Sequence, residues 1–211
     1  MNLLLLIFLV ALLLIGIFFL WKIFQAKGTS RLKISEWDEK LMAYHEAGHA
    51  VVFSELFGKN LLGTVTIDSN KNEFGSTKAN FNKNLNETYN DLILKISVAL
   101  SGRLSEQILL NEFTTSAIHD LSQSTFLATN MVIRLGMGKN IKFLQISEEN
   151  LKSCSNELKC AVEKDICSIL DEASKIAEKT IIENTATIEK IARILLSKKT
   201  IYADELQKIL D

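Results

Sequence analysis

The chain has 211 residues, of which 47% are hydrophobic and 23% are charged, and it is long enough to bury the core of one compact domain. Its formal net charge is −1 and its basic residues are dispersed, so the composition gives no sign of a nucleic-acid partner. Three cysteines without a C-x-x-C pair favour a reducing compartment. Their helical spacing predicts that Cys154, Cys160 and Cys167 are buried rather than bound to a metal.

The first predicted element is a membrane-spanning helix. Leu3 to Trp21 form an unbroken apolar run, which at about 1.5 Å per residue can cross a hydrocarbon core of about 30 Å. A secretory signal peptide is the alternative, but no charged segment precedes the run and no A-x-A site follows it. The basic residues that flank the run all lie on its C-terminal side, and the positive-inside rule then places residues 35–211 in the cytoplasm. We therefore expect a single-pass protein of the inner (cytoplasmic) membrane, with residues 1–21 as the span and 22–34 as a basic linker.

Residues 35–211 predict a mainly α-helical domain with one small β-hairpin. The sequence "SEWD", which begins at Ser35, is a capping box that opens a helix, and Gly58 is a plausible end for that helix. The period-two pattern of Gly63–Ile67 predicts a strand that pairs with the segment Phe74–Asn80. Further helices are expected over residues 87–110, 117–135 and 156–183, followed by two shorter ones ending at 210. No proline interrupts these patterns.

The stretch "AYHEAGHAVV" carries the chemistry. His45 and His49 are four residues apart and share one helix face, while Glu46 stands about 100° round the helix axis. Two histidines and a third ligand would hold zinc with one position left for water, whose pKa falls to about 7. Glu46 would act as the general base that takes a proton from the water and hands it to the leaving amine. A helix that contains H-E-x-x-H by chance is the alternative.

A catalytic zinc ion needs a third ligand, for which the candidates are Asp120, Glu106 and His119. Further stretches narrow the choice: "VALSGRLSEQIL", "FTTSAIHDLSQSTFLATNMVIRLGMG" and the histidine motif together resemble the proteolytic domain of FtsH-type membrane-anchored zinc metalloproteases. The similarity runs from about residue 38 to the C-terminus. The resemblance implies zinc as the cofactor and Asp120, in the T-T-x-A-x-x-D segment, as the third ligand. It also implies that Glu106 holds a ligating imidazole in place, while His119 points elsewhere on its helix.

The resemblance further places a substrate-binding strand near Val65, Thr66 and Ile67, because a peptidase can bind an extended peptide by adding it to an exposed sheet edge. The alternative is a small hairpin that only covers the core. Both readings fit the sequence.

The chain also departs from the family pattern. FtsH proteins carry an AAA ATPase module between membrane and protease, whereas here a short linker precedes the motif and no G-x-x-x-x-G-K-[ST] occurs. Ser116 stands where the family usually has glycine, and Phe74 and Gly75 lie where a Gly-Gly-Tyr-Thr-like strand is common.

Three hypotheses follow for the function. The first is a motor-independent zinc metalloendopeptidase that cleaves unfolded or membrane-proximal proteins. The second is a peptidase subunit that works beside a separate AAA ATPase or as a homo-hexamer. The third is a non-enzymatic, membrane-anchored helical interaction module. The intact base Glu46 argues against the third, because a structural zinc site is closed by four ligands and needs no base.

Overall fold

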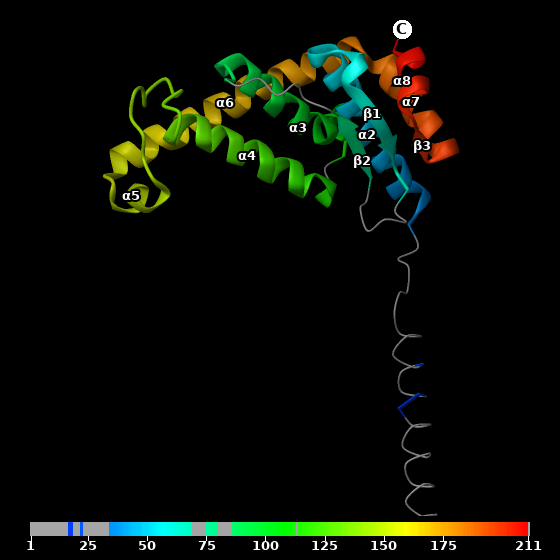
Figure 1. The fold of residues 1–211 in the computed structure, drawn as a ribbon, viewed down its shortest axis with the longest axis horizontal. Coiled ribbons are helices and arrows are strands. Elements are labelled where there is room, and N and C mark those ends of the chain that lie inside the picture. The colour runs from blue at the N-terminus through cyan, green and yellow to red at the C-terminus, as the bar shows by residue number, and fades with distance from the viewer. Residues whose placement is uncertain are drawn as a thin grey trace, which may run out of the picture. The chain divides into compact units, whose positions relative to one another are not determined.

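The computed structural model describes residues 17–18, 22, 34–68, 75–79, 86–112 and 114–210 (Figure 1). The chain divides into two compact units, Met1–Ser35 and Glu36–Asp211, and the elements below belong to the second. None of the helices in the described ranges is both long and apolar enough to span a bilayer. The predicted span, residues 3–21, falls outside the described residues except for Ile17 and Phe18.

Two helices of 22 residues position the histidine motif. Helix α2 covers Glu36–Phe57 and ends where Gly58 adopts a φ of 98°, as the sequence predicts. Helix α3 covers Tyr89–Leu110 and begins with a capping box in which Thr88 and Asp91 bond to each other's backbone N–H groups. The two helices lie so close together that a Cβ on Gly48 of α2 would fall 2.0 Å from Oγ of Ser105 on α3.

The remaining helices confirm a mainly α-helical domain. They are α4 (Ile118–Ile133), α5 (Glu148–Ser153), α6 (Asn156–Glu183), α7 (Thr185–Lys198) and α8 (Ala203–Ile209), with short 3₁₀ turns η1 (Lys59–Leu61) and η3 (Thr115–Ala117). The bounds of α6 are those predicted from its apolar periodicity, and α4 begins one residue later than predicted. Helix α5 was not predicted, because six residues are too short to show a helical period.

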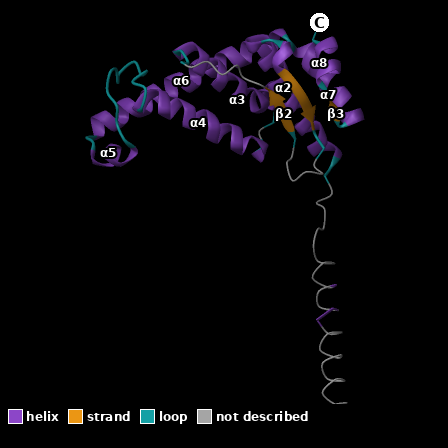
Figure 2. Ribbon diagram, viewed as in Figure 1, coloured by secondary structure: helices purple, strands orange, loops and turns teal. Residues whose placement is uncertain are grey.

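A small antiparallel sheet lies beside α2 (Figure 2). The predicted hairpin is confirmed as β1 (Leu62–Thr66) and β2 (Ser76–Ala79), which pair in an antiparallel register. A third strand, β3 (Thr200–Ile201), pairs with the other side of β1, so the order is β2-β1-β3. Strand β3 has two residues, which are too few to show an alternating pattern, so the sequence does not predict it.

The main hydrophobic core joins α3, α4 and α6, which Figure 1 shows running side by side. Helix α6 contributes a face centred on Ile169, together with Val162 and Ala173. Cys160 and Cys167 lie roughly 160–180° round the helix from Ile169, at about 100° per residue. Both cysteines are exposed, so the prediction that they are buried is wrong.

Candidate metal and catalytic site

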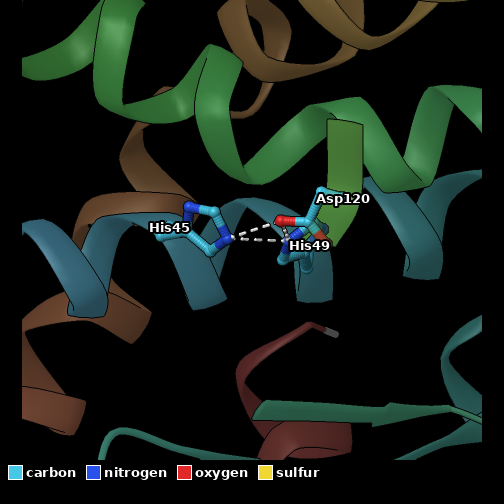
Figure 3. A group of neighbouring side chains, drawn as sticks. All are labelled: His45, His49 and Asp120. Carbon is cyan, nitrogen blue, oxygen red and sulfur yellow. Dashed lines mark hydrogen bonds and ion pairs between the residues drawn. The ribbon is translucent and has the colours of Figure 1, made fainter. Parts of the chain in front are cut away.

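Three side chains converge between α2 and the first turn of α4 (Figure 3). His45 and His49 project from α2, and Asp120 reaches them from α4. Nε2 of His45 lies 3.1 Å from Nε2 of His49 and 3.0 Å from Oδ2 of Asp120, and Nε2 of His49 lies 3.3 Å from the same oxygen. The structure therefore brings together the three residues predicted as metal ligands.

Hydrogen bonds behind the two rings fix which nitrogen faces the group. Nδ1 of His45 lies 2.7 Å from a carboxylate oxygen of Glu106, and Nδ1 of His49 lies 2.8 Å from the backbone carbonyl oxygen of Val98. Both partners accept, so each Nδ1 carries the proton and donates it outward. In the neutral rings both Nε2 atoms then point a lone pair at Asp120. Three lone-pair atoms within 3.3 Å repel one another unless a metal ion or a proton lies among them.

The spacing of these atoms suits zinc. Ligands about 2.0–2.1 Å from a tetrahedral zinc ion are separated from one another by about 3.3 Å, close to the distances found here. Gly102 of α3 leaves the necessary space, because a Cβ at this position would lie 2.5 Å from Nε2 of both His45 and His49. Two imidazoles and a carboxylate are also a donor set that zinc favours. The residues present therefore fit a zinc ion.

Gly102→Ala is expected to displace zinc without unfolding the protein. The added methyl group would occupy the space next to both ligating nitrogens, while alanine is a better helix former than glycine. Mutation of a residue that hydrogen-bonds to a metal ligand typically lowers metal affinity by roughly 10–100-fold, and we expect a larger loss of zinc affinity here. Equilibrium dialysis with zinc would measure the loss. Ser97→Ala, on the same helix with a hydroxyl bonded to the carbonyl of Ile93, is the control and should bind zinc like the parent. Equal affinities for the parent and G102A would show that this space is not used.

Glu106 supports His45 from behind. Its side chain is fully buried, and besides His45 it accepts hydrogen bonds from the hydroxyls of Thr114 and Ser116, each at 2.7 Å. Burial raises the pKa of Glu106, but these three donors outweigh burial and hold it below its usual value. Ser116, where the family usually has glycine, therefore contributes a hydrogen bond that a glycine cannot make.

The same contacts shift the pKa values of His45 and Asp120. Burial lowers the pKa of His45, but hydrogen bonds with Asp120 and Glu106 outweigh it and, without a metal ion, raise this pKa to about 9. Burial likewise opposes ionisation of Asp120, while His45 and His49 hold its pKa well below the ordinary range. Two carboxylates thus stay ionised around the imidazoles, which is the electrostatic environment that a divalent cation needs.

Glu106→Gln is expected to weaken zinc binding while preserving the fold. The amide oxygen of glutamine can still accept the proton on Nδ1 of His45, but the negative charge behind the imidazole is lost. Changes of this kind typically cost about 10–100-fold in metal affinity. Glu112→Gln, an exposed position just beyond the same helix, is the matched control. An E106Q protein that binds zinc as tightly as E112Q would show that the carboxylate does not support the ligand.

Glu46 lies beside the candidate metal ligands and is itself buried. Its Oε2 accepts a hydrogen bond of 2.7 Å from the hydroxyl of Thr77 on β2. Burial raises the pKa of Glu46, and the nearby His49 and His45 partly oppose the rise. A carboxylate with a raised pKa is a stronger proton acceptor than an exposed one, as a general base requires.

The other candidate residues occupy different places. His119 is exposed and stands outside the converging group, in agreement with the prediction that it points elsewhere. The substrate-binding role of Val65, Thr66 and Ile67 stays a prediction, but in the described residues these three do not lie at a free strand edge. Val65 pairs with both Thr77 and Ile201, because β3 occupies the side of β1 that the sequence left open. The backbone N–H of Ile67 also donates to the carbonyl oxygen of Lys199.

Four residues of the site were missed by sequence reasoning. Thr77 and Thr114 are hydroxyl donors to Glu46 and Glu106, Gly102 supplies space, and Ser101 lies with Oγ 3.2 Å from Nδ1 of His49. The histidine spacing gives no signal for them, since they lie on other elements. The glycine between two serines in "LSGRLS" is the one visible sign of a close approach on α3.

Buried histidines with a converging carboxylate and an adjacent glutamate define the class of zinc metallopeptidases. Residues 32–209 match the model of peptidase family M41. The chain belongs to this family, and the resemblance drawn from the sequence motifs is confirmed.

Similar curated proteins support this family assignment. The chain is 31% identical over 202 residues to the "ATP-dependent zinc metalloprotease FtsH" of Magnetococcus marinus, an alignment that covers 90% of this chain and 30% of the relative. Proteins of the same name from Mesoplasma florum and Halothermothrix orenii are each 32% identical, over 83% and 78% of this chain and 28% of each relative. The chain thus spans about three tenths of the length of these relatives.

Proposed function

We propose that this chain is a zinc metalloendopeptidase in which His45, His49 and Asp120 hold the metal and Glu46 is the general base. The observation that carries this assignment is the convergence of three lone-pair atoms, 3.0–3.3 Å apart, beside a buried glutamate. A non-enzymatic module with a structural metal would gain nothing from a buried, ionisable Glu46 beside this group. Burying such a carboxylate is costly, so its presence favours chemistry.

The chain's own residues account for the proton transfers of peptide hydrolysis. A zinc ion at this site would supply a Lewis acid and lower the pKa of a bound water to about 7. Glu46 then accepts the proton from the attacking water and delivers it to the amine of the departing peptide. Glu106 keeps the Nε2 lone pair of His45 directed at the metal position through its bond to Nδ1.

An extended peptide is proposed to bind along β2. In the described part of the chain, β2 is the end strand of the sheet and has one partner, β1. Its residue Thr77 touches Glu46, so a peptide paired with β2 would lie next to the general base. An unpaired strand edge binds extended peptides through main-chain hydrogen bonds, and these do not depend on the peptide's sequence. This position differs from the one predicted on β1, a strand that is paired on both sides.

Residues 3–21 are proposed to anchor the domain in the inner membrane, with the active site in the cytoplasm. Support comes from the apolar run itself and from the basic residues that follow it, notably Lys22 and Lys27. An enzyme held at the membrane surface meets unfolded and membrane-proximal segments, which are the proposed substrates.

A second candidate is a peptidase that depends on an AAA ATPase, as a separate partner or within a homo-hexamer. The curated relatives favour it, because their names describe ATP-dependent enzymes and this chain matches only about three tenths of their length. Both candidates use the same zinc site and differ in how the substrate is delivered.

Cleavage of denatured casein by the full chain in detergent, with zinc and without ATP, tests the proposed function. Turnover that is unchanged by ATP supports a motor-independent peptidase. Zinc bound at one ion per chain without casein cleavage would reject motor-independent activity and favour an ATPase partner. A protein that binds no zinc would contradict the metal assignment itself.

A further inference from the structure

Strand β2 contacts the proposed general base through one side chain. Oγ1 of Thr77 lies 2.7 Å from Oε2 of Glu46 and 3.1 Å from the backbone carbonyl oxygen of the same residue. A hydroxyl has one proton to donate, and the carboxylate oxygen is the closer of the two acceptors. The Thr77 hydroxyl therefore donates its proton mainly to the Glu46 carboxylate, and the backbone carbonyl oxygen is a more distant neighbour.

The second carboxylate oxygen is confined by the same strand segment. A Cβ on Gly75 would lie 2.7 Å from Oε1 of Glu46 and 3.2 Å from its Cγ, so only a residue without a side chain fits there. Gly75 also has a φ of 115°, a conformation that favours glycine. The Glu46 carboxylate is thus held by a donor at one oxygen and by a close backbone at the other.

We propose that Thr77 is a positioning residue for Glu46, an inference that rests on the proposed function. A glutamate side chain has three rotatable bonds, and a general base is effective only within hydrogen-bond reach of the proton it abstracts. Among the described residues, the Thr77 hydroxyl is the side-chain donor to the Glu46 carboxylate. Its loss leaves a buried carboxylate free to turn away from the metal ligands.

The same strand links the base to the proposed substrate edge. Thr77 pairs with Val65 of β1 on one side of β2, and no strand in the described ranges pairs with the other side of β2. A peptide added to that outer side would be fixed relative to Glu46 through a single strand of four residues. Thr77 therefore sets the position of the base relative to the scissile bond, a role that affects turnover more than peptide binding.

The test compares kcat, KM and zinc content for Thr77→Val, Thr77→Ser and Thr200→Val in the full chain, with denatured casein as substrate. Valine matches the shape of threonine without its hydroxyl, and serine keeps the hydroxyl. Thr200 lies on β3 of the same sheet, where its hydroxyl is 2.7 Å from that of Thr66, so T200V removes a structural hydroxyl away from the base.

We expect T77V to lose roughly 10- to 100-fold in kcat, the cost of a misplaced catalytic group, with KM and zinc content unchanged. T77S should recover most of the kcat, and T200V should match the parent. Equal kcat values for T77V and the parent would overturn the inference and leave the zinc peptidase intact. A similar loss in T77V and T200V would also overturn it, by showing a general effect on the sheet. A parent that binds no zinc would overturn the inference and the proposed function together.

Discussion

Asp120→Ala is expected to remove bound zinc and peptidase activity together. The carboxylate is the only negatively charged member of the converging group, with Oδ2 at 3.0 Å and 3.3 Å from the two imidazole nitrogens. Without it, two neutral imidazoles on one helix face remain, and these leave the tetrahedral site two ligands short. Zinc content after dialysis should fall from one ion per chain to nearly none, and casein cleavage should fall to background. His45→Ala should behave in the same way.

His119→Ala is the matched control for this prediction. It changes the neighbouring residue in the same turn of α4, but His119 is exposed and outside the converging group. H119A should keep the zinc content and the activity of the parent. A D120A protein that retained stoichiometric zinc would contradict the ligand assignment, and zinc loss in H119A would move the third ligand to His119.

Glu46→Gln is expected to keep zinc and lose turnover. The glutamine amide is nearly the same shape and can still bond to the Thr77 hydroxyl, but it does not accept a proton from water. General acid–base catalysis contributes about 10²–10⁴-fold to a rate, and kcat should fall by a factor in that range. Steady-state cleavage of denatured casein, with zinc measured on the same sample, provides both numbers.

Glu55→Gln serves as the control for this change, since Glu55 is an exposed residue of the same helix. It should show the zinc content and the kcat of the parent. An E46Q enzyme as active as E55Q would contradict the role of Glu46 as general base. Loss of zinc in E46Q would instead place Glu46 among the groups that hold the metal.

The helices and the two candidate histidine ligands could be predicted from the sequence because both depend on local spacing. The apolar period of α6 gave its bounds, and the four-residue spacing of His45 and His49 gave two ligands on one face. Asp120 lies 75 residues after His45, and its assignment needed the resemblance of a longer segment, "FTTSAIHDLSQ". The structure then brings it within hydrogen-bond distance of both rings.

Long-range contacts account for what the sequence did not predict. Strand β3 pairs with β1 because the chain returns to the sheet after α7, and among the described strands this leaves β2 and β3, not β1, at the ends of the sheet. The Thr77 hydroxyl reaches Glu46 across 31 residues, and no residue spacing encodes that approach. The cysteines of α6 were misplaced for a related reason: their spacing is helical, but the face they share is the one turned away from Ile169.

The most direct test of the zinc site as the catalytic centre is removal and return of the metal in the full chain. The protein is treated with a chelator, dialysed and titrated with zinc, and casein cleavage and bound zinc are measured on the same samples. We expect activity to disappear with the metal and to return in proportion to zinc, reaching its maximum at one ion per chain. Cleavage that persists in a protein free of zinc and other divalent metals would contradict the role of His45, His49 and Asp120 in the reaction.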